Sequence, residues 1–370
     1  MDRRLFVRAS GTALLGFGLD PTLATGTFQP GQPAPRGRTL VCLFQRGAVD
    51  GLSMVVPYVE PNYYRARPSI TIPPPGRPGG VIDLDGRFGL HPTLAPLAPL
   101  YRRRSMAVVH AVGSPSATRS HFDAQNYLES GTPDVKSTAD GWLNRYLRQS
   151  AGLHAAPFRA VAWGSHLPRA LQGGAPAVTA DRLESMGFPA VERAPRDTIP
   201  YPASPLGHSL REIAQLIKGD LSLEIAFADV GGWDTHVNQG ATAGPLALRL
   251  ADLGGSLAAF ANDLGERLAD VVILTMSEFG RTVAENGAGG TDHGRATAML
   301  ILGGAVNGGR VLGDWPGIDP FARFPGRDLE VTTDFRDVFG EVLVRHLGAT
   351  NLGAIFPGHT LDLGWLGALG

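Results

Sequence analysis

The chain has 370 residues, and its 33 Lys and Arg side chains are nearly balanced by 34 Asp and Glu, which gives a formal net charge of −1. This balance disfavours nucleic acid as a partner, because phosphate binding needs an excess or a stripe of basic side chains. Hydrophobic residues make up 43% and charged residues 18% of the chain, a composition typical of globular rather than disordered proteins. The single cysteine, Cys42, excludes an internal disulfide and a thiolate zinc cluster.

The N-terminal residues have the pattern of an export signal. Arg3 and Arg4 precede a short apolar stretch at 9–19, which falls well short of the ~20 residues needed to span a bilayer. The pattern resembles a twin-arginine signal, and Thr22-Leu23-Ala24 offers a small-residue cleavage site. We therefore expect a signal peptide over 1–24, a flexible lead-in over 25–38, and export by the twin-arginine translocase to the periplasm or beyond. The alternative is an amphipathic first helix of the folded domain.

The rest of the chain alternates between strand and helix patterns. Apolar runs and helical spacing predict, in chain order, a strand at 39–44, a helix at 92–104, a strand at 106–111, helices at 122–130 and 141–149, a strand at 158–163, a helix at 204–218, a strand at 223–227, a helix at 245–268, strands at 271–275 and 298–302, and a helix at 335–346. The Pro- and Gly-rich segment 57–90 and the irregular segment 168–200 interrupt this order. The alternation predicts a single α/β domain over 39–370, with a mostly parallel central sheet flanked by helices and no stable membrane span.

Polar residues gather where the predicted strands end. In open α/β sheets the active site lies beyond the carboxyl ends of the strands, so these residues are expected to meet at one edge. Several Asp, Glu and His side chains without Cys form the ligand set of zinc, manganese and similar divalent ions. The candidates are Arg46, Asp50, Arg119, Ser120, His121, Asp234, His236, Glu278, Asp292 and His293.

These strand-end segments carry a resemblance to a known family. They read FQRGAVDGL (44–52), RSHFDAQNYLESG (119–131), GGWDTHVNQG (231–240), TMSEFGRT (275–282) and GTDHGRATAMLILGG (290–304). The chain resembles the bacterial family labelled domain of unknown function 1501, within the alkaline phosphatase-like superfamily. The resemblance implies an alkaline phosphatase-like fold, bound divalent metal, a nucleophile at a helix N-terminus, and hydrolysis of phosphate or sulfate esters.

The resemblance also implies roles for single residues. Asp50, Asp234 with His236, Glu278, and His293 with Asp292 as its neighbour match metal-binding positions, and Ser120 falls near the nucleophile, although His121 or Thr118 could be the matching residue. Arg119 and Arg46 would complement charge that develops on the transferred group. The chain departs from the pattern at Phe279, where the superfamily usually has a second ligand His, and in the spacing of Asp234 and His236, which are separated by one residue instead of three.

Purely structural roles are open for the same residues. Ser120 could serve only as a helix N-cap, Asp50 could belong to an ordinary turn, and Glu278 could pair with Arg281. The remaining alternatives are a loop anchor for Asp234 and His236, a structural Asp–His bond for Asp292 and His293, and carboxylate pairing for Arg46 and Arg119.

The sequence thus predicts an exported, metal-dependent hydrolase of a small-molecule or glycan ester. The expected ion is zinc, or else manganese, calcium or magnesium, and it would lower the pKa of Ser120 or of a water. The rival prediction is a catalytically degenerate envelope protein of the same fold that binds a glycan or a protein partner. Phe279 in place of a ligand favours this rival.

Overall fold

The computed structural model describes residues 37–150, 159–182, 199–360 and 365–370. The predicted signal peptide at 1–24 and nearly all of the lead-in at 25–38 lie outside the described residues. From residue 36 onward the chain forms one compact unit. Among the described residues, no helix combines the length and the apolar character needed to cross a membrane.

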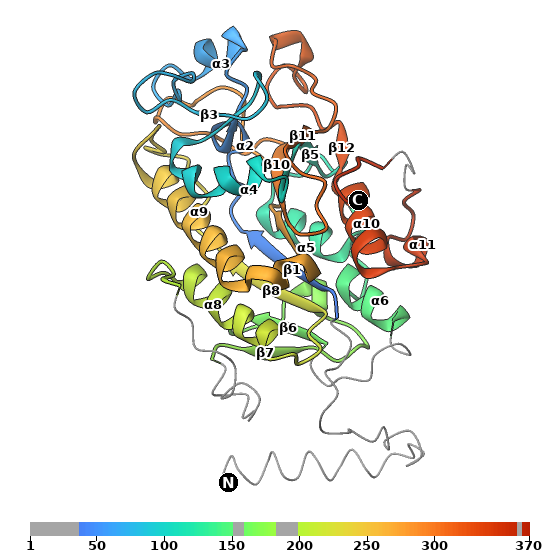
Figure 1. Ribbon diagram of the computed structural model, residues 1–370. Coiled ribbons are helices and arrows are strands. Elements are labelled where there is room, and N and C mark those ends of the chain that lie inside the picture. The colour runs from blue at the N-terminus through green and yellow to red at the C-terminus, as the bar shows by residue number, and fades with distance from the viewer. Residues whose placement is uncertain (1–36, 151–158, 183–198, 361–364) are drawn as a thin grey trace, which may run out of the picture. The chain divides into compact units, whose positions relative to one another are not determined.

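A nine-stranded sheet runs through the centre of this unit (Figure 1). Its order is β11-β5-β10-β9-β1-β8-β6-β7, and β12 pairs with β5. All pairings are parallel except those that β10 makes with β5 and β9, so the predicted α/β class with a mostly parallel sheet is confirmed. The strands are β1 (Thr39–Gln45), β5 (Met106–Gly113), β6 (Ala160–Trp163), β7 (Val178–Ala180), β8 (Ile225–Val230), β9 (Val271–Met276), β10 (Thr297–Gly303), β11 (Arg310–Leu312) and β12 (Thr333–Asp334).

Helices cover both faces of the sheet, because its strands are apolar on both sides. On β1, Val41 and Leu43 face one core, while Leu40, Cys42 and Phe44 face the other. The first core is covered by the 3-10 helix η2 (Pro92–Leu97), α4 (Ala98–Arg102), α8 (Pro205–Lys218) and α9 (Pro245–Leu264). The second is covered by α5 (His121–Ser130), α6 (Trp142–Gln149), α10 (Phe335–Leu347) and α11 (Leu352–Ile355), which Figure 1 shows on the opposite side from α8 and α9.

Short elements complete the chain and mark where the sequence pattern was too brief to detect them. The segment after β1 contains α2 (Gly51–Met54), α3 (Pro61–Ala66) and a small sheet of β2 (Val55–Val56), β4 (Gly89–Leu90) and β3 (Ile82–Asp83). The 3-10 helices η3 (Arg169–Leu171), η5 (Gly265–Asp270) and η6 (Pro320–Ala322) lie in later connections. The helix predicted at 92–104 begins as a 3-10 helix because Pro96 lies inside it.

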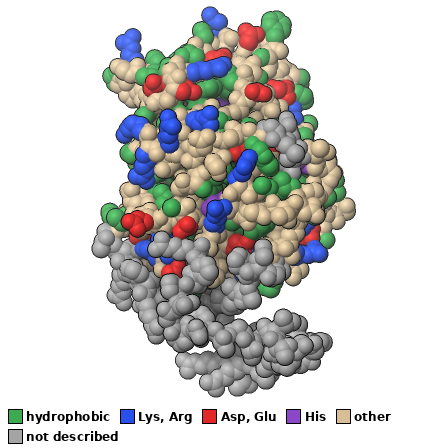
Figure 2. Space-filling model, turned by 45° about the vertical axis from the view of Figure 1, so that its right-hand side comes forward, with side chains coloured by type: hydrophobic (Ala, Val, Ile, Leu, Met, Phe, Trp, Pro, Cys, Tyr) green, Lys and Arg blue, Asp and Glu red, His purple; other side chains and the backbone are tan. Residues whose placement is uncertain are grey.

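The reversed direction of β10 decides which loops meet. Because β10 runs antiparallel to β9 and β5, its N-terminal end lies at the same edge as the carboxyl ends of β1, β5, β8 and β9. His293 precedes β10 and is therefore brought to the edge that the loops after those strands occupy. On the face drawn in Figure 2, acidic and basic side chains are interspersed, in keeping with the near balance of charge.

Candidate metal centre

Three imidazoles and one carboxylate converge at this edge of the sheet. The Nε2 atom of His293 lies 3.0 Å from Nε2 of His121 and 2.9 Å from Nε2 of His236. The Oδ1 atom of Asp234 lies 3.0 Å from Nε2 of His236, 3.3 Å from Nε2 of His293 and 3.5 Å from Nε2 of His121. Ligand atoms of His121, Asp234 and His293 all lie within 4.8 Å of one another. We call these four residues the His/Asp cluster.

The four members of the cluster come from three different connections. His121 is the first residue of α5, which follows β5, and Asp234 and His236 lie in the loop after β8. A Cβ on Gly290 would lie 2.3 Å from the carbonyl oxygen of His236, so glycine lets the loop before β10 press against the loop after β8. The amide of Thr291 also donates to the carbonyl of Thr235 at 3.1 Å. This close approach carries His293 to His236.

Carboxylates hold two of the imidazoles by their Nδ1 atoms. Nδ1 of His121 lies 2.7 Å from Oε1 of Glu278, and Nδ1 of His236 lies 3.1 Å from Oδ1 of Asp292. Since a carboxylate only accepts hydrogen bonds, it places the imidazole proton on Nδ1 and leaves the lone pair on Nε2. Metal-binding histidines are characteristically oriented in this way.

The third imidazole is held by a backbone carbonyl. Nδ1 of His293 lies 2.9 Å from the carbonyl oxygen of Arg119, which again assigns the proton to Nδ1. The Nε2 lone pairs of His121 and His236 therefore each face Nε2 of His293, and all three imidazoles face Asp234. Such lone pairs repel at contacts of 2.9–3.0 Å unless a proton or a cation lies between them.

The separations within the cluster suit a small divalent cation. For tetrahedral bonds of about 2.0–2.1 Å to zinc, neighbouring ligand atoms lie roughly 3.3 Å apart. Apart from the pair His121 and His236, the observed separations run from 2.9 to 3.5 Å. Imidazole nitrogens with one carboxylate oxygen are also the donor set that zinc prefers. The residues present thus fit the metal that the sequence predicted.

Burial and neighbouring charges shift the pKa values of the residues in and around the cluster. The hydrogen bond to Glu278 raises the pKa of His121, whereas burial lowers the pKa of His293. Burial opposes ionisation of Glu278, but the hydrogen bonds from His121 and Gln125 hold its pKa below the ordinary value. Glu278 is therefore an anion at neutral pH.

Arg281 anchors the carboxylate of the cluster. Its buried guanidinium donates to Oδ1 of Asp234 and to the carbonyl oxygens of Gly47, Ala48 and Thr291. Burial opposes ionisation of Asp234, but the hydrogen bond and charge of Arg281, together with His236 and His121, hold its pKa below the ordinary value. The alternative in which Glu278 pairs with Arg281 is not what the structure contains, because Glu278 bonds to His121 and Arg281 to Asp234.

With this geometry in place, comparisons identify related chains. Residues 221–346 match the family described as "Protein of unknown function (DUF1501)". The resemblance inferred from the motifs is thus confirmed over this segment. The DUF1501 segment holds Asp234, His236, Glu278, Asp292 and His293, whereas His121 lies before it. None of the curated proteins matches the chain.

Solved structures similar to the chain include one described as a member of the superfamily that the motifs implied. A protein in the alkaline phosphatase superfamily from Vibrio parahaemolyticus is 12% identical over 75% of this chain and 65% of that chain, with a TM-score of 0.36. The PsFucS1 sulfatase from Pseudoalteromonas sp. is 12% identical over 85% of this chain and 68% of that chain, with a TM-score of 0.41. The periplasmic domain of EcEptC from Escherichia coli, in complex with Zn, is 10% identical over 74% of each chain, with a TM-score of 0.40.

Glu278 and Asp292, also predicted as metal ligands, instead bind the Nδ1 atoms of His121 and His236, while Asp50 lies away from the cluster. Its buried carboxylate lies 2.6 and 3.0 Å from the guanidinium of Arg67 and accepts from Ser53 at 2.8 Å and Gln239 at 2.7 Å. Burial raises the pKa of Asp50, but Arg67 and the two other donors hold it below the ordinary value. Both oxygens are already engaged by these donors, so Asp50 organises the loop after β1 instead of facing the His/Asp cluster.

The predicted catalytic residues lie around the cluster. Ser120 is exposed and caps α5, where its Oγ accepts from the amide of Asp123 at 3.4 Å. The next residue, His121, belongs to the cluster itself. Arg119 pairs with Asp328 at 2.5 Å and keeps 38% of its side chain exposed.

Arg46 is more fully engaged than Arg119. Its guanidinium lies 2.7 Å from Asp229, 2.9 Å from Glu129 and 3.0 Å from Gln125. Gln125 also donates to Oε1 of Glu278 at 2.9 Å, so it links Arg46 to the cluster. Arg46 therefore has the carboxylate pairing that was open as its alternative role.

The sequence analysis did not predict two contacts around the cluster, those of Gln125 and Phe279. Gln125 lies one helical turn after His121, and this i, i+4 spacing was the only local signal that it shares a face with the cluster. Phe279 stacks on His121 with ring centroids 4.9 Å apart and lies 5.1 Å from His293. At the position where the superfamily usually has a ligand, Phe279 thus packs against two imidazoles.

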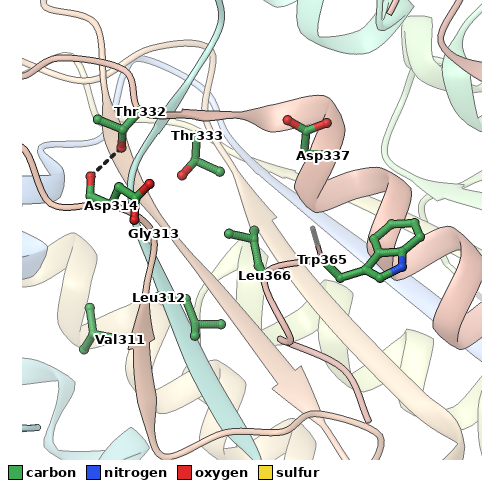
Figure 3. A pocket seen from close by; sticks show the side chains of 9 residues that line it. All are labelled: Val311, Leu312, Gly313, Asp314, Thr332, Thr333, Asp337, Trp365 and Leu366. Carbon is green, nitrogen blue, oxygen red and sulfur yellow. Dashed lines mark hydrogen bonds between the residues drawn. The ribbon is translucent and has the colours of Figure 1, made fainter. Parts of the chain in front are cut away.

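A separate cavity of about 450 Å³ lies beside β11 and the start of α10 (Figure 3). Thr332 donates to the carbonyl of Asp314 at 2.6 Å, and Asp337 lies 2.7 Å from Nε2 of His359. The lining residues are Val311, Leu312, Gly313, Asp314, Thr332, Thr333, Asp337, Trp365 and Leu366. No member of the His/Asp cluster is among them, so this cavity is distinct from the candidate metal centre.

Proposed function

We propose that the chain is a metal-dependent hydrolase of phosphate or sulfate esters, with zinc in the His/Asp cluster. The observation that carries this proposal is the common orientation of the three imidazoles, whose Nδ1 atoms are engaged and whose Nε2 atoms face Asp234. His121, Asp234 and His293 would hold the ion, and His236 lies within reach of two of these three residues. Three protein ligands that leave one position open are typical of catalytic rather than structural zinc.

A bound divalent cation would supply a Lewis acid for the oxygens of the ester group. Ser120 is the residue that we propose as nucleophile, since it is exposed and precedes the ligand His121 at the start of α5. The positive end of the helix dipole favours the alkoxide form of a hydroxyl at this position. The Ser120 oxygen would attack phosphorus or sulfur as the alcohol leaves, and water would then release the covalent ester.

Arg119 is the cation that we propose for the developing oxyanion. Its carbonyl already orients His293, and its guanidinium is partly exposed next to Ser120. Arg46 would act indirectly, since it holds Gln125 against Glu278. Charge-assisted hydrogen bonds from arginine are well suited to phosphate and sulfate oxygens.

The test separates a nucleophile from a ligand. We expect His293→Ala to lose both bound zinc and turnover of 4-nitrophenyl phosphate or sulfate, because it removes the central Nε2 of the cluster. Ser120→Ala should lose turnover but keep the wild-type zinc content, at a cost of about 1 kcal/mol in stability from the lost cap. Full activity of Ser120→Ala would remove Ser120 from the mechanism.

A non-catalytic binding protein is the second candidate, and one observation favours it. Phe279 packs on His121 and His293 where the superfamily usually has a ligand, and this leaves the site with fewer donors than a two-metal hydrolase needs. Wild-type protein that binds zinc but turns over no phosphate or sulfate ester would support this candidate.

We also propose that the protein is exported. The observation in support is the Arg3-Arg4 pair ahead of a short apolar stretch, which would be read by the twin-arginine translocase. The mature protein would then act on its ester substrate in the periplasm or outside the cell.

A further inference from the structure

One buried glutamine connects three loops near the His/Asp cluster. Gln239 is fully buried in the connection after β8, three residues beyond His236. Its Nε2 atom donates to Oδ2 of Asp50 at 2.7 Å. Its Oε1 atom accepts from the hydroxyls of Thr235 at 2.8 Å and Thr291 at 2.7 Å. The amide is therefore engaged on both sides, by residues from the loops after β1 and β8 and before β10.

The carboxylate of Asp50 decides which way the amide of Gln239 faces. A carboxylate only accepts hydrogen bonds, so the NH₂ group must face Asp50 and the carbonyl oxygen must face the two threonines. The guanidinium of Arg67 favours the charged form of Asp50, since it lies 2.6 and 3.0 Å from the two carboxylate oxygens. The hydroxyls of Thr235 and Thr291 both donate to the one oxygen that remains, and this holds the two threonines together.

These two threonines stand beside members of the cluster. Thr235 lies between Asp234 and His236, and Thr291 precedes His293 by two residues. Both threonines are buried, so water does not compete for their hydrogen bonds. Oδ1 of Asp234 and Nε2 of His293 face each other at 3.3 Å across the same two loops. A change in the spacing of the threonines would therefore change the spacing of these two atoms.

Backbone hydrogen bonds also join the two loops. The amide of Gln239 donates to the carbonyl of Gly289 at 2.9 Å, and the amide of Asn238 donates to the carbonyl of Ala288 at 3.0 Å. These bonds do not involve the side chain of Gln239, so the loops should stay paired when that side chain is replaced. Its own hydrogen bonds would then set the final spacing. A metal site tolerates errors of only about 0.2 Å in its bonds.

We infer that Gln239 is a positioning residue for metal binding, which sets the spacing between Asp234 and His293. The inference rests on the proposed function, because it assumes that the His/Asp cluster holds zinc. It adds a residue outside the ligand set and a property of the site, namely a preformed spacing that suits zinc better than a larger ion. Site size and rigidity together decide between divalent cations.

Gln239→Leu tests the inference, because leucine fills a similar volume and removes all three side-chain hydrogen bonds. Competition with a chromophoric chelator at pH 7 would measure the affinity for zinc and for cadmium, a larger ion. We expect zinc to bind about tenfold more weakly, as when a partner of a metal ligand is lost. Cadmium should lose roughly threefold or less, because a looser site accommodates a larger ion. A loss of stability alone would weaken the binding of both ions alike.

Gln45→Leu is the matched control. Gln45 is also fully buried, at the end of β1, and its side-chain amide has no hydrogen-bond partner among the described residues. The same substitution there removes no contact to the loops of the cluster. It should leave the affinity for both ions unchanged.

A triple variant separates positioning from stability. Gln239→Leu leaves the buried hydroxyls of Thr235 and Thr291 without their acceptor, which destabilises the protein. Adding Thr235→Val and Thr291→Val removes these hydroxyls while keeping the shape of the side chains. The triple variant should unfold at a higher urea concentration than Gln239→Leu and keep its weakened zinc binding.

Three results would overturn the inference and leave the proposed function standing. They are wild-type zinc affinity in folded Gln239→Leu, an equal loss for zinc and cadmium, and recovery of zinc binding in the triple variant. If Gln239→Leu does not fold, the triple variant provides the same comparison of the two ions. Failure of the wild type to bind zinc would instead refute the proposed function, and the inference with it.

Discussion

Replacement of Glu278 by glutamine should weaken zinc binding although it removes no ligand. The side chain of Glu278 is fully buried, and its Oε1 accepts from His121 at 2.7 Å, from Gln125 at 2.9 Å and from the amide of Gly47 at 2.9 Å. Glutamine has nearly the same shape but no charge. The variant therefore isolates the effect of the carboxylate on the orientation and basicity of the His121 imidazole.

The expected loss of affinity follows from the burial of this pair. Loss of an outer partner of a metal-bound histidine typically costs 10–100-fold in metal affinity, which is roughly 1.4–2.7 kcal/mol. Because Glu278 is shielded from water and lies within 2.7 Å of His121, we expect a loss toward the upper end of this range. Asp292 likewise orients His236, whose Nδ1 lies 3.1 Å from Oδ1 of Asp292, but the side chain of Asp292 is 50% exposed. Asp292→Asn should therefore cost tenfold at most.

Competition with a chromophoric chelator at pH 7 would measure zinc affinity in both variants. Thermal unfolding of the metal-free proteins serves as the control for folding. Wild-type affinity in a folded Glu278→Gln variant would refute the assignment of His121 as a ligand oriented by Glu278. A larger loss in Asp292→Asn than in Glu278→Gln would contradict the argument from burial.

The remaining predictions concern pH, a buried ion pair and export. Zinc affinity should fall as the pH is lowered from 8 to 6, because zinc competes with a proton for His121, whose pKa is raised by Glu278. An affinity that does not depend on pH in this range would exclude His121 as a ligand. Asp50→Asn should destabilise the protein by about 3–5 kcal/mol in urea unfolding, since it leaves the buried Arg67 without its charge partner, and the folded fraction should retain zinc. Zinc loss without destabilisation would return Asp50 to the ligand set. Lysine at both Arg3 and Arg4 should leave folded precursor in the cytoplasm in a fractionation assay, and unchanged export would argue against a twin-arginine signal.

Local sequence patterns were sufficient to predict the main strands and helices. The strand predicted from the apolar run at 39–44 is β1, and the helix predicted from the cap and spacing at 204–218 is α8. These elements follow from short-range preferences that any segment carries wherever it lies in the fold. The long helix predicted at 245–268 ends at Leu264, where Gly265 takes a φ of 53° that other residues rarely adopt. Short pairings such as β11 and β12 escaped detection, because two or three residues carry no periodicity.

The candidate site required more than the residues at strand ends. His121, His236 and His293 could be nominated from their positions, because loops after parallel strands meet at one edge. Which carboxylate each imidazole faces depends on contacts between residues far apart in the chain, such as His121 with Glu278. The role of Asp50 also depends on a distant contact. Its position after a strand suited a metal ligand, but in the structure the side chain of Arg67 binds both of its oxygens.

The sequence by itself determined the α/β class, the order of its principal elements and the set of residue types available to bind a metal. Only the tertiary structure decided the direction of β10, and with it the arrival of His293 at the shared edge. It also decided that Arg281 anchors Asp234 and that Phe279 lines the cluster. The physical reason is that backbone preferences act over a few residues, whereas the partner of a buried charge is chosen by which distant segments pack together.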